Sequence, residues 1–245
     1  MTKTPIITLA VLAAISAQST FAADCTVTEK LTILSPQMKE MYESMSPSQQ
    51  GHLRKSRMGF LSGIPIKGIL YVSGKKLRSD IAGVTTVYDS GTNKLVTINR
   101  TNQTYSVRSL AGTQSPISAA VTSLGPGVRI LGHATRHYRF STNMRNAQFR
   151  GLAMSGEIWS AQDLPSNRLA LSMLGGGVQA PTQLQKIKGQ VLKVTAQITG
   201  TPIGSISVNS YPVSVSTARI PVTIFAVPKG YRQTAPSRNV GPLGG

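Results

Sequence analysis

The chain has a single cysteine, Cys25, so it cannot form an internal disulfide. Aromatic residues make up only 5% of it, which is too few for a platform that stacks nucleic-acid bases. Aspartate and glutamate together number 8, against 26 lysines and arginines, so a paired-carboxylate mechanism is poorly supplied. These scarcities argue against a disulfide-rich domain, a base-stacking module and a carboxylate-dependent hydrolase.

Long hydrophobic runs are missing as well. The longest mostly apolar run, Ile6 to Ile15, spans about ten residues, whereas a membrane-spanning helix needs about 20. It follows Lys3 and precedes a polar stretch with small residues, which is the layout of a secretory signal peptide. We therefore expect residues 1–22 to be cleaved after Ala22, leaving a soluble protein exported to the periplasm.

The charge that is present is strongly positive, with a formal net charge of +18 and a pI near 10.6. Such a balance favours anionic partners such as lipid headgroups or an anionic membrane surface. Export argues against specific nucleic-acid binding as the physiological role. Cys25 invites comparison with lipid-modified proteins, but Asp24 stands where lipid attachment needs a small residue, so we expect Cys25 to carry a free thiol.

Helical periodicity is confined to two regions. Ser35 with Pro36, and Ser46 with Pro47, are typical of an N-cap followed by the first helical residue. The first helix places an apolar stripe on one face at the spacing i, i+3, i+4 and i+7, made of Met38, Met41, Tyr42 and Met45. A second helical region is expected from Ser166 up to the glycines at 175–177.

Alternation of apolar and polar residues dominates the rest and predicts short antiparallel strands. The expected strands are 25–33, 66–74, 75–82, 84–89, 94–99, 103–109, 128–142, 152–161, 190–199, 205–215 and 220–227. Residues 111–128, rich in small and polar residues, are expected to form a long loop. The predicted organisation is one domain over residues 23–231 and a disordered tail over residues 232–245.

No catalytic, cofactor-binding or metal-binding set emerges from the pattern. His133 and His137 are four residues apart, but on a strand that separation is roughly 13 Å, too far for both to bind one ion. No carboxylate or thiolate lies beside them in the sequence, so we interpret them as part of a solvated basic face. An enzyme would require His137, Asp80 and a hydroxyl to converge in one cleft.

Several ordered motifs carry a resemblance to a known family. They are "KKLRSDIAG", "TTVYD", "NKLVTINRTNQTY", "LGHATRHYRF", "GEIWSAQDLP" and "IFAVPKGYR". In this order they resemble periplasmic half-barrel proteins related to lipoprotein carriers, the lipoprotein-localisation-like superfamily, and especially a sister group of exported domains of unknown function. The Arg-Pro step and the Phe-x-Trp strand of the true carriers are absent from this chain.

The resemblance implies a mainly β fold, an antiparallel incomplete barrel with a short lid helix across its open side. It also implies a non-enzymatic protein that binds lipid or another amphiphile, as a carrier or an envelope-maintenance factor. Met38, Met41, Tyr42 and Met45 are then the expected ligand-binding residues, because methionine packs against varied apolar shapes. The alternative is a structural or interaction protein of the cell envelope, with a filled core, no ligand and a protein partner.

Overall fold

The computed structural model describes residues 24–55, 62–110, 117–144, 151–165, 183–201 and 203–236. In chain order the elements are β1 (Cys25–Leu34), α1 (Pro36–Ser44), α2 (Pro47–Lys55), β2 (Ile66–Ser73), β3 (Lys76–Ile81), β4 (Val84–Asp89), β5 (Lys94–Asn99), β6 (Thr104–Ser109), β7 (Ile117–Pro126), β8 (Thr135–Met144), β9 (Ala153–Ala161), the 3-10 helix η3 (Leu184–Lys186), β10 (Gln190–Thr201), β11 (Gly204–Ser216), the 3-10 helix η4 (Val222–Phe225) and β12 (Arg232–Gln233). The expected signal peptide (1–22) and the helix expected from Ser166 lie outside the described residues.

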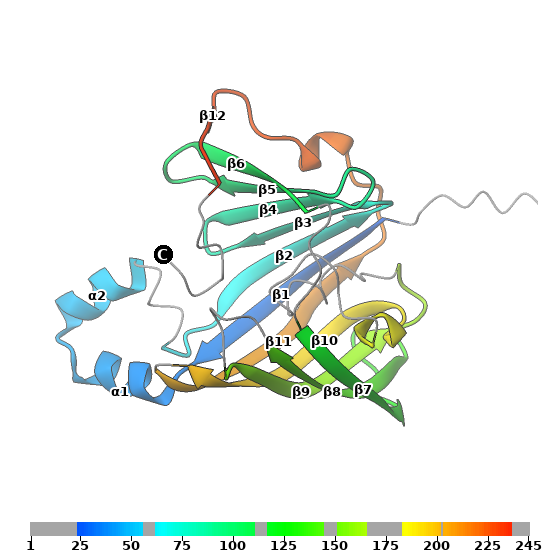
Figure 1. The fold of residues 1–245 in the computed structure, drawn as a ribbon, viewed down its shortest axis with the longest axis horizontal. Helices are drawn as coiled ribbons and strands as arrows, with labels where there is room; N and C mark the ends of the chain where they lie inside the picture. Colours follow the sequence, from blue (N-terminus) through cyan, green and yellow to red (C-terminus); the bar gives the residue numbers. More distant parts are fainter. Residues whose placement is uncertain are drawn as a thin grey trace, which may run out of the picture.

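All strands belong to one 12-stranded sheet in the order β12-β6-β5-β4-β3-β2-β1-β11-β10-β9-β8-β7. Neighbouring strands are antiparallel except for the short β12–β6 pair, which is parallel. The first and last strands of the order, β12 and β7, do not pair with each other, so the sheet stays open. Figure 1 shows the long strands β1, β2 and β11 running diagonally between an upper limb, β3–β6, and a lower limb, β7–β9. The expected mainly β, antiparallel and incomplete barrel is confirmed.

Local turn chemistry explains the meander from β2 to β6. The β3–β4 turn has positive φ at both central residues, Ala82 (49°) and Gly83 (78°), as a two-residue hairpin turn requires. The pairing then runs without a shift from Ile81 opposite Val84 to Lys76 opposite Asp89. Turn and alternation therefore fix the same register, and the strands expected in this region are all present.

Both helices begin where the serine–proline pairs predict. The Ser35 hydroxyl accepts a hydrogen bond from the Met38 amide (3.4 Å), and Pro36 occupies the first helical turn. In α2, Ser46 and Gln49 form a reciprocal capping box: Ser46 N–H donates to Gln49 Oε1 (2.9 Å), and Gln49 N–H donates to Ser46 Oγ (3.4 Å). In Figure 1 the two helices lie beside one end of the sheet, where α1 packs against β11.

Two expectations from the alternation are wrong. The predicted loop at 111–128 contains β7, which pairs with β8 from Ile117 opposite Met144 to Pro126 opposite Arg136. The predicted strand at 220–227 is instead the 3-10 helix η4. Its Pro221 has no N–H to donate to a strand ladder, and Arg78 Nη1 binds the Ile224 carbonyl oxygen at 2.5 Å, which fixes the helix against β3.

The start of the expected tail is also ordered, contrary to the prediction of disorder from residue 232. Arg232 N–H donates to the Gln103 carbonyl (3.0 Å), and Thr234 N–H donates to the Tyr105 carbonyl (2.8 Å). These bonds attach β12 to the edge of β6 and cover an otherwise unpaired strand edge. Residues 237–245 lie outside the described part of the chain.

Candidate binding surface

The register shows which side chains share the inner face of the sheet, because residues directly opposite each other point to the same side. A buried cluster joins Cys25 and Val27 of β1 and Leu77 of β3 to Ala161 of β9 and Leu192 of β10. β3 is separated from β9 and β10 by intervening strands in the sheet order. One buried cluster therefore gathers side chains from strands on both sides of β1, and we take the face that carries Val27 and Leu77 as the inside of the curved sheet.

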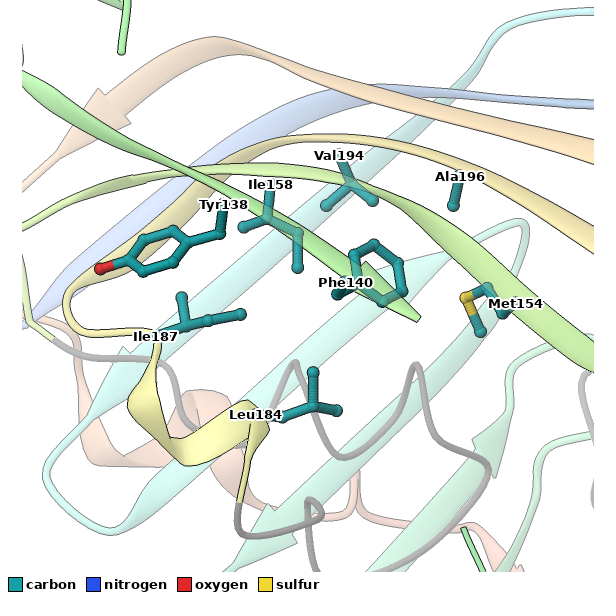
Figure 2. Close-up of a cluster of buried hydrophobic side chains, with 8 residues drawn as sticks. All are labelled: Tyr138, Phe140, Met154, Ile158, Leu184, Ile187, Val194 and Ala196. Atoms are coloured by element: carbon teal, nitrogen blue, oxygen red, sulfur yellow. The ribbon is translucent and has the colours of Figure 1, made fainter. Parts of the chain in front are cut away.

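On the lower limb the inner face is covered by the chain itself. Leu184 of η3 and Ile187, which follows it, pack on the side chains of β8, β9 and β10, among them Phe140 and Ile158. Figure 2 shows Leu184 and Ile187 facing those strands across the cluster. Burying each of the two gains about 1.5–3 kcal/mol. This limb of the sheet is therefore a closed core.

The upper limb differs, because large apolar side chains on the same inner face stay half-exposed. The register carries this face from β1 across β2 and β3 to β5, through pairs such as Leu31 with Ile66 and Ile81 with Val84. We call the following set the open inner surface: Leu31, Ile66, Leu70, Ile81, Val84 and Leu95, all half-exposed.

Hydroxyl side chains continue this face toward the edge of the sheet. Leu70 is opposite Ser79, Ser79 opposite Thr86, Thr86 opposite Thr97, and Thr97 opposite Ser106. The inner face of the upper limb therefore carries a row of hydroxyl groups across β3 to β6, with aliphatic side chains such as Ile81 and Leu95 on either side of it. A face with both kinds of side chain suits a molecule that has apolar and polar parts.

Glu29 of β1 lies within the apolar part of this face. Ser210 donates its hydroxyl proton to Glu29 Oε2, and a β-bulge at Thr28 and Glu29 shifts the register at this point. A Cβ added at Gly68 would meet Glu29 Cγ at 3.0 Å and Ile81 Cγ1 at 3.4 Å, so the glycine leaves room for the carboxyl group. Desolvation raises the pKa of Glu29 above its ordinary value, and the bond from Ser210 opposes this.

The four residues expected to bind ligand are divided by the structure. Met38 is buried, in a cluster with Ile206 of β11 that also contacts Ile33 and Ile198, so it anchors α1 to the inner face at the end of the sheet. Met41 is exposed, and Tyr42 and Met45 are half-exposed. Their role as ligand contacts stays a prediction.

Each histidine of β8 and its preceding turn has its own acidic partner, so the expectation that they lack one is wrong. His133 Nδ1 is 2.8 Å from Asp163 Oδ2, and His137 Nε2 is 3.0 Å from Glu157 Oε2. The hydrogen bond with His137 is the main cause that lowers the pKa of Glu157, and the bond with His133 does the same for Asp163. Both carboxylates are distant in sequence, and only strand pairing brings them near.

The His137 ring also stacks on the ring of Trp159, with the ring centroids 4.4 Å apart. Lys193 of β10 places its Nζ 4.3 Å from the centroid of the Trp159 ring. Asp80 belongs to a separate cluster on β3, where it binds Arg78. His137 and Asp80 thus each have other partners, and the structure does not bring them together. Within the described ranges no three His, Cys, Asp or Glu side chains form a group that could hold a metal ion.

Hollows on the surface of the described chain include the following two. One, of about 390 Å³, is lined by residues 219–223, and the other, of about 430 Å³, is lined by residues of the β7–β8 hairpin together with Gln162 and Asp163. Neither is lined by the open inner surface. No helix in the described ranges is long and apolar enough to cross a membrane.

Fold and surface together define a class: an open antiparallel half-barrel whose inner face is closed on one limb and partly uncovered on the other. No protein-family model matches the chain, and the search of curated proteins gives no match. Among solved structures, a LolA superfamily protein from Nitrosomonas europaea matches over 84% of this chain and 90% of its own, with a TM-score of 0.33 and 8% sequence identity. Ligand binding is argued below from this chain's own residues.

Proposed function

We propose that this chain is a non-enzymatic periplasmic protein that binds a lipid or another amphiphile on its open inner surface. The observation that carries the proposal is the half-exposed aliphatic set on the inner face of β1–β5. An acyl chain laid on it gains about 0.8 kcal/mol per buried CH₂ group. Ten such groups would contribute on the order of 8 kcal/mol, against about 1 kcal/mol for one surface lysine near anionic lipid.

The neighbouring residues fit this use. The hydroxyl groups of Thr86, Thr97 and Ser106 would face the polar end of the ligand, because they continue the same face. Met41 and Tyr42 on α1, and Met45 directly after it, would contact the ligand from one end of the sheet, with Met38 as the anchor of the helix. The signal-peptide layout of residues 1–22 supports export to the periplasm.

Blocking the surface tests the proposal. Thr86→Trp adds a large ring to the half-buried inner face, whereas Gln197→Trp adds the same ring to an exposed position of β10. Binding of dansyl-undecanoic acid is followed by the rise in its emission, and co-purified lipid is identified by native mass spectrometry and extraction. We expect wild type and the Gln197 variant to bind and the Thr86 variant to lose most binding. If no variant binds and the purified protein carries no lipid, the proposal fails.

A second candidate is a structural or interaction protein of the envelope without a ligand. The closed lower limb favours it, since η3 already fills the inner face there. This candidate requires the inner face of the upper limb to be filled in the same way. Recovery of one stoichiometric envelope protein by cross-linking, together with lipid-free protein, would select it.

A further inference from the structure

The turn between β7 and β8 exposes two large aliphatic side chains at its tip. Val128 is 61% exposed and Leu131 is 48% exposed, although other apolar side chains in this hairpin, such as Tyr138 and Phe140, are buried. Leu124, in the bulge at the end of β7, is also exposed. We call residues 127–133 the hairpin tip.

Backbone geometry makes Leu131 an unexpected choice for its position. Ile130 and His133 exchange two backbone hydrogen bonds of 3.0 Å, which closes a two-residue turn over Leu131 and Gly132. Both central residues have positive φ, 49° at Leu131 and 85° at Gly132, as in a type I′ turn. Asparagine or glycine is preferred at the first of these positions, because a bulky side chain is strained there. Folding alone therefore does not explain a leucine at this position.

The tip is held firmly by contacts with the rest of the fold. Ile130 packs against the buried cluster of β1, β3 and β10. Thr135 Oγ1 donates to the Val128 carbonyl (2.6 Å), and Gly127 N–H donates to the Thr135 carbonyl (2.8 Å). Ile130 thus points inward while Val128 and Leu131 are presented to solvent on a fixed backbone.

The surroundings of the tip are basic. Residues 117–144 contain three arginines and no aspartate or glutamate. Arg129 and Arg136 are exposed and line the hollow of about 430 Å³ beside the tip. Arg129 Nη1 binds the Gly132 carbonyl (2.6 Å) and Arg136 Nε binds Ser123 Oγ (3.3 Å), and neither arginine forms an ion pair within the described ranges. The one carboxylate that lines this hollow, Asp163, binds His133.

We propose that the hairpin tip docks the protein on an anionic lipid surface, with Val128 and Leu131 entering the interface and Arg129 and Arg136 contacting the headgroups. Two or three aliphatic side chains are far too small an area for a stable protein interface, which buries about 800 Å² per partner. They suit shallow insertion combined with electrostatic attraction. The net charge of +18 adds long-range attraction to such a surface. This docking is independent of ligand binding on the open inner surface.

Leu131→Asn is the decisive variant, because asparagine suits the positive φ while it removes the apolar side chain. Binding of the purified exported protein to vesicles is measured by co-sedimentation, with phosphatidylglycerol–phosphatidylcholine vesicles and with phosphatidylcholine alone. We expect Leu131→Asn to bind the anionic vesicles about tenfold more weakly, as the loss of a buried leucine implies. Its melting temperature should be equal to or above that of wild type. Arg129→Gln and Arg136→Gln should each weaken binding about fivefold.

Val222→Asn is the matched control, since Val222 is 81% exposed but lies on η4, away from the hairpin. It should bind vesicles like wild type. Equal binding by wild type and the Leu131 variant, or equal binding to neutral and anionic vesicles, would overturn the proposal. Failure of wild type to bind any of the vesicles would also overturn it. The same holds if the tip binds a protein partner and not the vesicles. If wild type binds dansyl-undecanoic acid but does not bind vesicles, the docking proposal fails and the proposal of ligand binding on the open inner surface is unaffected.

Discussion

Removing the carboxylate of Asp80 should destabilise the upper limb of the sheet strongly. Asp80 accepts two hydrogen bonds of 2.9 Å from the Arg78 guanidinium and one of 2.6 Å from Thr85 Oγ1. It also forms an ion pair with Arg100 Nη2 at 3.0 Å. The Arg78 and Asp80 side chains are only 13% and 16% exposed. Arg78 also binds the Ile224 carbonyl of η4, so the same cluster connects β3 to the segment that follows β11.

The magnitude follows from burial. Asp80→Asn keeps the volume but leaves the guanidinium of Arg78 without its counter-charge, and removing one partner of a buried pair costs roughly 3–5 kcal/mol. Arg100 is 50% exposed, so its share is small because solvent screens it. We take about 3 kcal/mol as the net loss, because the pair retains some exposure. For a domain of this size, each 1 kcal/mol lowers Tm by about 2–4 °C, so Tm should fall by roughly 6–12 °C.

The assay is thermal unfolding followed by circular dichroism at neutral pH, with Glu43→Gln as control. Glu43 forms an exposed ion pair with Lys39 at 3.7 Å on α1. Such a pair contributes about 0.3–0.5 kcal/mol, so Tm should change by no more than about 2 °C. If the Tm of Asp80→Asn is as high as that of Glu43→Gln, the cluster of Asp80 with Arg78, Thr85 and Arg100 does not stabilise the fold in the way its geometry indicates.

Two further predictions concern the inside of the sheet. Burial raises the pKa of the Glu29 carboxyl above its ordinary value, so the folded state favours the neutral form. The stability that this neutral carboxyl contributes is fully present below its unfolded-state pKa. It is lost as the pH rises through its folded-state pKa. Glu29→Gln should therefore gain Tm relative to wild type at about pH 8 and much less at about pH 4, and an equal difference at both would contradict this. Cys25 is fully buried and burial raises the pKa of its thiol to about 11, so a thiol reagent should label it only after denaturation. Labelling of the native protein at the rate of a free thiol would show that the first strand opens.

Local patterns in the sequence were sufficient for much of the fold. The meander from β2 to β6 follows from alternation combined with turn residues such as Ala82 and Gly83, because each hairpin closes within a few residues. The helix starts followed from the capping residues at Ser35 and Ser46. In both cases the groups that decide the structure lie within four residues of each other.

β7 and η4 could not be predicted from local sequence patterns. β7 contains several serines and alanines, and the small Ala119 is one of the β7 side chains that pack against the core, so its alternation is weak without β8 beside it. η4 has the apolar spacing of a strand, but the bond from Arg78, 146 residues earlier in the chain, holds it as a turn of 3-10 helix. Propensity is a weak prior where tertiary contacts of this kind compete with it.

The candidate surface shows the same division. The sequence by itself determined which residues are apolar, which strands they occupy and that carboxylates are scarce. Only the tertiary structure decided that Ser210, 181 residues after Glu29, donates to its carboxyl, and that η3 covers the inner face of one limb. The physical reason is that a strand pattern specifies two faces, whereas the curl of the whole sheet specifies which face is inside and how much of it stays uncovered.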